Sequence, residues 1–181
     1  MAATEKKQMW YWAGDRPEER NYPIAASQGI FMPGAPCYIS TSGTVTLVGT
    51  TANANQALHG HIVGLANASS AWPIAAELDA NTVVKVALAK ANTIYAMYVE
   101  NNGTDLAAAQ THVGDELGLT VSSTATQIGY TTADVNKTTN TVVRVVDIAS
   151  NVEGSLFTTS DNPGVVLVKV RQANIDSVIT A

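Results

Sequence analysis

The sequence predicts an all-β protein, a single-domain β-sandwich or barrel with one short helix and an extended N-terminal arm. Several segments alternate apolar and polar residues with the period of two that is typical of half-buried strands, most clearly 44–48, 83–88, 141–148 and 165–171. Short stretches rich in Gly, Pro, Asn, Asp and Ser separate them and indicate turns. Many short strands joined by such turns are typical of sandwiches and barrels.

The two clearest strands lie within residues 81–100 and are joined by a short polar turn. In the first strand, Val84, Val86 and Leu88 share one face. In the second strand both faces are apolar, with Ile94, Ala96 and Tyr98 on one and Tyr95, Met97 and Val99 on the other. A strand without a polar face is covered on both sides, by its own fold or by another subunit. We therefore take Tyr95, Met97 and Val99 as candidate partner-interface residues.

Residues 1–28 differ in texture from the rest and are predicted to form the extended arm, followed by a β-domain over 29–181. The arm contains an aromatic cluster, then a charged run and two prolines, and it shows no strand period. Its aromatics fold back onto the core of the domain, or dock on a neighbouring subunit, since Trp and Tyr are strong interface anchors. A disordered segment is the third alternative. The candidate partner-interface residues of the arm are Met9, Trp10, Tyr11 and Trp12.

The remaining elements follow from the same reasoning. Strands are expected at 35–39 and 61–66, with weaker ones at 116–121 and 127–130. Thr104 can cap a short helix over 105–112 that Gly114 ends. The tail from 172 to 181 is compatible with a last strand. No internal repeat of fixed period is visible.

Composition narrows the class of function. Only 14% of the 181 residues are charged, against about a quarter in ordinary domains, so we expect partners to cover part of the surface. The net charge of −5 offers no basic surface for nucleic acid, and no apolar run is long enough to predict a membrane span. A single cysteine, Cys37, excludes an intramolecular disulfide, and the start lacks the apolar core of a secretion signal. We expect synthesis in a cytoplasm.

Residues with catalytic or metal-binding potential are few. His59 and His61 would share one face of a strand and could bind a metal with His112, although ordinary polar roles are favoured. Asp115 and Glu116 could form a catalytic dyad, although a solvated turn is favoured. Cys37 lies in an expected strand, where a buried thiol is usually inert. We expect no enzymatic activity, no cofactor and no bound metal.

The order of several segments resembles the small β-domain of capsid decoration (cement) proteins of tailed bacteriophages. The similar segments are 34–40, 42–45, 62–66 and 84–86. Segments 113–115, 145–148 and 165–170 are similar to the structural proteins often encoded near a phage major capsid protein, so the resemblance covers 29–171. It implies a non-enzymatic virion protein that is made in the host cytoplasm, binds the outside of the capsid shell through the major capsid protein, and is often a trimer.

Two other classes of function compete with this interpretation. One is a carbohydrate- or receptor-binding β-sandwich of a phage tail or fibre, with Trp72 beside Asn67 and Ser69 as an aromatic platform. The other is a hydrolase on a β-scaffold, which lacks a recognisable acid–base set. The partners expected from the sequence are therefore the major capsid protein and further copies of this chain, with no nucleic acid and no membrane.

Overall fold

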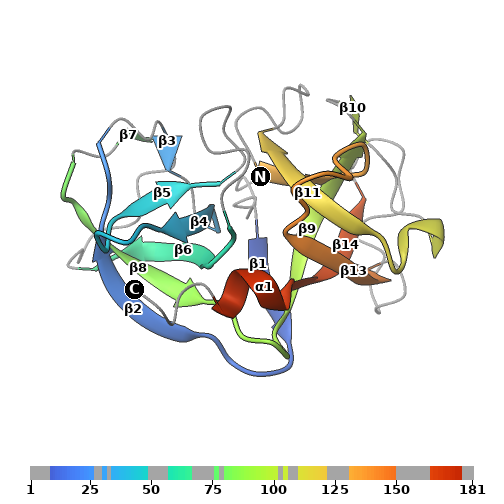
Figure 1. Cartoon of the computed structure of the whole chain (residues 1–181), viewed down its shortest axis with the longest axis horizontal. Helices are drawn as coiled ribbons and strands as arrows, with labels where there is room; N and C mark the ends of the chain where they lie inside the picture. Colours follow the sequence, from blue (N-terminus) through green and yellow to red (C-terminus); the bar gives the residue numbers. More distant parts are fainter. Residues whose placement is uncertain are drawn as a thin grey trace, which may run out of the picture.

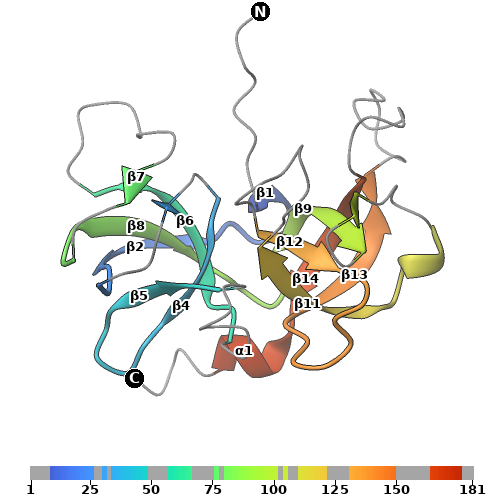
Figure 2. The same cartoon turned by 90° about the horizontal axis from the view of Figure 1, so that it is seen from above.

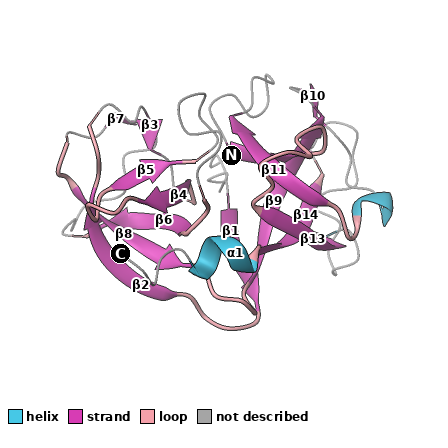
Figure 3. Ribbon diagram, viewed as in Figure 1, coloured by secondary structure: helices cyan, strands magenta, loops and turns pink. Residues whose placement is uncertain are grey.

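The computed structural model describes residues 9–26, 30–31, 34–48, 57–66, 76–77, 80–101, 104–105, 110–121, 131–149 and 164–176. Strands dominate these residues, which confirms the predicted all-β fold (Figures 1 and 3). Most of the strands belong to two sheets that lie side by side. Among the described residues, no helix has the length and apolar character needed to cross a membrane.

The first sheet forms what we call the N-terminal ring, on the left in Figure 1. Its strands, in spatial order, are β2 (Glu18–Pro23), β8 (Val83–Leu88), β6 (Gly60–Leu65), β4 (Pro36–Ile39) and β5 (Val45–Leu47). A parallel bridge between Ile24 and Val45 joins the end of β2 to β5, and the N–H of Ala25 donates to the carbonyl of Val45 at 2.9 Å. The interior is filled by apolar residues that include Cys37, Ile62, Val84 and Val86.

The second sheet closes into what we call the C-terminal ring, on the right in Figure 1. Its strands, in spatial order, are β9 (Ile94–Asn101), β14 (Val165–Val170), β13 (Val143–Ile148), β11 (Glu116–Val121) and β12 (Thr131–Asp134). β12 returns to β9 in parallel, which completes the ring. Val166, Val168 and Val170 face its interior, as the alternation in 165–171 predicts.

The two rings have the same topology. We number the five strands of each ring in chain order, so that strands 1 to 5 are β2, β4, β5, β6 and β8 in the first ring and β9, β11, β12, β13 and β14 in the second. In both rings strand 1 pairs with strand 5, strand 5 with strand 4, strand 4 with strand 2, and strand 2 with strand 3. All of these pairs are antiparallel. The third strand then pairs in parallel with the first strand or its immediate extension. The chain is therefore a structural tandem repeat, which the sequence did not reveal.

The register of the pairs makes the repeat residue-specific. Both fourth strands carry an irregularity at the same place, between Ile62 and Gly64 in β6 and between Val145 and Asp147 in β13. Both second strands are preceded by a glycine with positive φ whose N–H donates at 2.9 Å to the residue before the irregularity, Gly34 to Ile62 and Gly114 to Val145. The separation between equivalent residues differs from strand to strand, and for this reason no fixed period is visible.

Strand β1 (Met9–Ala13) lies outside the repeat and pairs antiparallel with the first half of β9. Its side chains explain why β9 is apolar on both faces. Met9 is fully buried in the core of the C-terminal ring, beside Tyr95 and Met97, while Trp10 and Trp12 pack on the outer face formed by Ala96 and its neighbours. The outer cover of β9 thus comes from the same chain.

The equivalent outer face of the N-terminal ring is polar. Glu19 and Lys85 form an ion pair on this face at 3.5 Å. By the register of the strand pairs, the equivalent residues of the C-terminal ring are the apolar Ile94 and Leu167. A tryptophan-bearing strand would gain nothing on a charged face, so the outer faces of the two rings differ in the way that the cover by β1 requires.

Three predictions about elements are wrong. Residues 9–23 do not form a separate extended arm, because β1 and β2 are strands of the two sheets. Residues 105–112 do not form one helix, because Thr104–Asp105 (β10) extend the sheet by pairing with β9 and Gln110–His112 make a single 3₁₀ turn. The tail begins with a short helix, α1 (Gln172–Asp176), instead of a strand.

The remaining strands are short, or begin at residues other than those predicted from the sequence. β3 (Ile30–Phe31) pairs with β7 (Ala76–Glu77) at the edge of the N-terminal ring. The weak strand expected at 127–130 and the platform at Trp72 lie outside the described residues, whereas β12 begins at Thr131. β8 and β9, the two clearest strands of the sequence, belong to different rings, and residues 89–93 cross between them.

Candidate functional site

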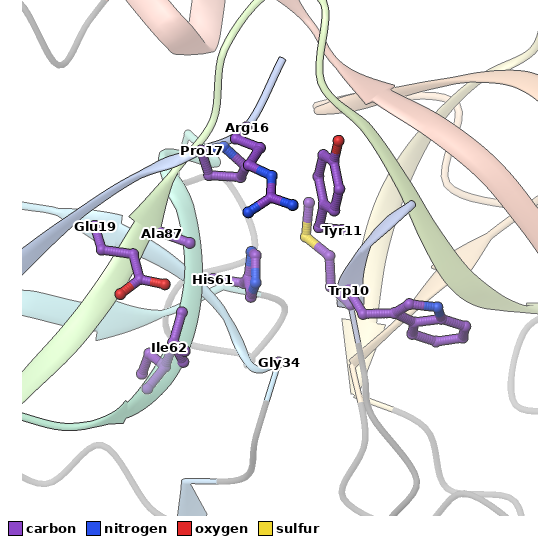
Figure 4. Close-up of a pocket in the computed structure, with 11 residues that line it drawn as sticks. Trp10, Tyr11, Arg16, Pro17, Glu19, Gly34, His61, Ile62 and Ala87 are labelled. Atoms are coloured by element: carbon purple, nitrogen blue, oxygen red, sulfur yellow. The ribbon is translucent and has the colours of Figure 1, made fainter. Parts of the chain in front are cut away.

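A cavity of about 450 Å³ lies between the two rings, beside β1, and we call it the inter-ring groove. Its volume falls in the range of small-molecule sites. It is lined by Met9, Trp10, Tyr11, Arg16, Pro17, Glu19, Gly34, His61, Ile62, Val63 and Ala87 (Figure 4). Figure 2 shows from a second direction that β1 lies between the two groups of strands.

One wall of the groove is β1. Successive side chains of this strand point to opposite faces of the sheet, so only some of them face the groove. Trp10 turns away from the groove and packs edge-to-face on Tyr98, with the ring centroids 5.8 Å apart (Figure 4). Tyr11 remains 37% exposed at the groove, and its hydroxyl donates to the carbonyl of Gly14 at 2.9 Å. This wall therefore offers an exposed phenol ring that is fixed by its own hydrogen bond.

The opposite wall is β6, and its irregularity shapes the surface. The register shift between Ile62 and Gly64 leaves Val63 without a partner in β8, and Val63 is 41% exposed. Such bulges redirect a side chain that would otherwise follow the pleat. Next to it, His61 points into the groove (Figure 4) and its imidazole contacts Tyr95 at a centroid distance of 5.4 Å.

The joint between β1 and β2 forms the rim of the groove and is held against the crossing between the rings. Thr93 donates its hydroxyl to the carbonyl of Asp15 at 2.7 Å, and Asn92 donates to the Asp15 carboxylate at 3.4 Å. Arg16 follows directly, is exposed, and forms no ion pair with any described residue. The groove therefore combines apolar walls with one guanidinium that is available to a ligand.

The three histidines do not form a metal site. His59 is buried, lies at 4.8 Å from the ring of Tyr38, and accepts a hydrogen bond at Nδ1 from the N–H of Ile39 at 3.0 Å. Burial lowers its pKa to about 4, so the neutral form is stable. His112 lies elsewhere and pairs with Asp115 at 3.2 Å. No cluster of three or more His, Cys, Asp or Glu side chains suited to a metal occurs among the described residues.

The other residues with possible chemistry also have structural surroundings. Cys37 is fully buried inside the N-terminal ring, and burial raises the pKa of its thiol far above the usual range. Asp115 and Glu116 are bound to different partners, since Glu116 pairs with Arg171 at 3.1 Å.

The structure divides the seven partner-interface residues chosen from the sequence. Met9, Tyr95, Met97 and Val99 are fully buried within the chain, so choosing them as partner contacts was wrong. Their apolar character reflects packing between β1 and the C-terminal ring. Trp10 and Trp12 are half-buried on the outer face, and only Tyr11 reaches the groove as an exposed residue. Sequence reasoning missed Arg16 and Val63, because nothing local shows that distant strands bring them together.

Comparisons of the chain with protein-family models, with curated proteins and with solved structures found no match.

Proposed function

We propose that this protein is a structural virion protein of a tailed bacteriophage, a decoration protein that binds the outside of the capsid shell and stabilises it. The proposal starts from the resemblance of segments within 29–171 to decoration proteins. Its structural support is the inter-ring groove, where Tyr11 and Val63 are both exposed. Large apolar side chains that stay exposed on opposite walls of one concavity favour a binding role.

The surroundings of the reactive side chains support the same proposal. His59 and Cys37 are buried in the N-terminal ring, and Asp115 and Glu116 belong to two separate ion pairs at the surface. A protein that acts by covering and clamping a shell needs a stable scaffold and a docking surface. The two closed rings joined through β1 supply the scaffold, and the groove supplies the surface.

The test is binding of the purified chain to capsids that lack it, measured by co-sedimentation and by the temperature at which the shells open. Val63→Asp should weaken binding at least tenfold, because it places a charge on an apolar wall of the groove. Val121→Asp is the matched control, since Val121 is also an exposed valine on a strand, 37% exposed against 41% for Val63, but lies outside the groove. Equal binding by both variants would contradict docking through the groove, and no binding by the wild-type chain would contradict the decoration role.

An assembly of several copies remains part of this proposal, with a trimer favoured by the resemblance. The two apolar faces of β9 are not evidence for such an assembly, because residues of β1 cover the outer face within the same chain. Light scattering on the purified chain tests it directly, and a single mass equal to one chain at micromolar concentration would contradict it.

A carbohydrate- or receptor-binding module of a tail or fibre is the second candidate. One observation favours it, namely an exposed aromatic ring, Tyr11, beside a charged rim with Arg16 and Glu19. Aromatic platforms with polar neighbours suit sugar rings. Glycan-array binding that is lost in Tyr11→Ala, together with no binding to capsids, would select this function over decoration.

A further inference from the structure

We infer that the inter-ring groove binds an extended, acidic peptide segment that adds as a strand to the free edge of β1. This inference deepens the proposed function, on which it rests for the identity of the partner, by naming the chemistry of the segment that the capsid protein would supply.

The first observation is the open edge of β1. Among the described strands, β1 is the terminal strand of its sheet and pairs only with β9. Within the described part of the chain, no backbone hydrogen bond joins its other edge to any segment. In an antiparallel pair, alternate residues direct their N–H and C=O away from the partner strand. Met9 is fully buried and the register of β1 is irregular between Tyr11 and Ala13, so the stretch of this edge that can offer backbone donors and acceptors to an extended peptide is centred on Trp10 and Tyr11.

The second observation is where this edge lies. Met9 to Tyr11 of β1 border the groove, with the side chain of Trp10 turned away and only that of Tyr11 exposed there, and β6 supplies the facing wall. A peptide strand on β1 would send alternate side chains toward the two exposed apolar residues of the groove, Tyr11 and Val63. Backbone pairing would give affinity, and these apolar contacts would select β-branched or aromatic side chains.

The third observation is the charge at the rim. Arg16 is exposed at the groove and has no ion pair with a described residue, whereas the nearby Glu19 is paired with Lys85 at 3.5 Å. Among the described residues that line the groove, the unmatched charge is therefore positive. A carboxylate of the peptide would pair with the guanidinium in two-point geometry, which fixes the position of the added strand.

The experiment uses the immobilised full-length chain and a library of hexapeptides with acetylated and amidated ends. Bound peptides are sequenced, and the tightest is resynthesised for titration. We expect alternating β-branched or aromatic residues with one Asp or Glu at a constant position. Arg16→Glu should weaken the acidic peptide at least about fivefold, as expected for loss of an exposed charge pair followed by repulsion. Arg144→Glu is the matched control, because Arg144 is an exposed arginine on β13 outside the groove.

If the peptide adds as a strand, binding requires its backbone amides, whereas binding through side chains alone would not. Two versions of the tightest peptide carry N-methyl groups on alternate residues, one in each frame. Only alternate amides of the peptide donate to β1, so one frame should abolish binding and the other should retain it. Equal effects of the two frames, an enriched set without acidic residues, no enrichment of any peptide, or an unchanged affinity in Arg16→Glu would each overturn the inference.

These outcomes are separable from failure of the proposed function. If the chain decorates capsids and Arg16→Glu decorates them as well as the wild type, the decoration role stands and the groove is not its peptide site. If the chain binds acidic peptides in one N-methyl frame but does not bind capsids, the strand-addition site stands and its partner is another protein.

Discussion

The imidazole of His61 meets the ring of Tyr95 edge-on, with the centroids 5.4 Å apart and the planes at 78°. His61 belongs to β6 of the N-terminal ring and Tyr95 to β9 of the C-terminal ring, so this contact joins the two copies of the repeat. Tyr95 is also the register partner of Tyr11 in β1. The two rings and β1 thus meet at one place, and the groove lies beside it.

Met9 is the residue through which β1 should contribute most to stability. Its side chain projects from β1 and is fully buried in the core of the C-terminal ring. We expect Met9→Ala to lower the free energy of unfolding by about 2–5 kcal/mol, because it removes buried contacts and leaves a cavity. Urea unfolding followed by fluorescence measures this. Val121→Ala, at an exposed position, should change the stability by no more than about 0.5 kcal/mol. A Met9→Ala variant as stable as that control would show that β1 is not part of the core.

Gly14 should be essential for the joint between β1 and β2. Its φ is +84°, and a Cβ added there would lie 2.0 Å from the carbonyl oxygen of Asn92. Gly43 provides a matched control, because its φ is +75° and no atom lies within 4 Å of the added Cβ. Both alanine variants carry the backbone strain of about 1–2 kcal/mol, but only Gly14→Ala adds a clash with backbone. We expect a clearly lower urea midpoint for Gly14→Ala than for Gly43→Ala, and equal midpoints would contradict the close approach at Asn92.

His59 should make the fold sensitive to mild acid. Burial lowers its pKa from 6.5 to about 4 in the folded chain, so between these values the unfolded chain binds more protons. The stability contributed by neutral His59 is therefore complete above pH 6.5 and is lost as the pH falls toward 4, by roughly 3 kcal/mol in total. Denaturant unfolding at pH 7.5 and pH 4.5 measures the loss.

His59→Asn provides the control for this pH dependence. The amide oxygen of asparagine can accept the hydrogen bond from the N–H of Ile39 but does not titrate, so the variant should lose less stability than the wild type over the same interval. Identical pH dependence in both proteins would show that His59 is not the group responsible.

Cys37 should react with thiol reagents only when the chain unfolds. It is fully buried inside the N-terminal ring, and burial also holds the pKa of its thiol far above the usual range, so the thiolate is scarce. At pH 8 we expect the native chain to react with an aromatic disulfide reagent at least a hundredfold more slowly than the chain in 6 M guanidinium. Rapid reaction of the native chain would mean that this ring opens on the timescale of the assay.

Local sequence patterns placed several elements correctly. The strands predicted at 83–88 and 116–121 have the same bounds as β8 and β11, and the inward set Val166, Val168 and Val170 is confirmed. These successes share a cause, since the period of side chains along a strand depends only on the backbone of that strand. The helix over 105–112 failed because Asp105 pairs with Glu100, a contact that its own propensity does not reveal.

The sequence by itself determined that this chain is all-β, where its main strands run and which of their residues face a core. Only the tertiary structure decided which strands pair. It placed β8 and β9 in separate rings, repeated one topology, covered β9 with Trp10 and Trp12 of the same chain, and brought Arg16 and Val63 to one groove. The physical reason is that strand pairing and apolar cover are satisfied by whichever complementary segment packs best, at any distance along the chain, and the sequence of one strand does not name that segment.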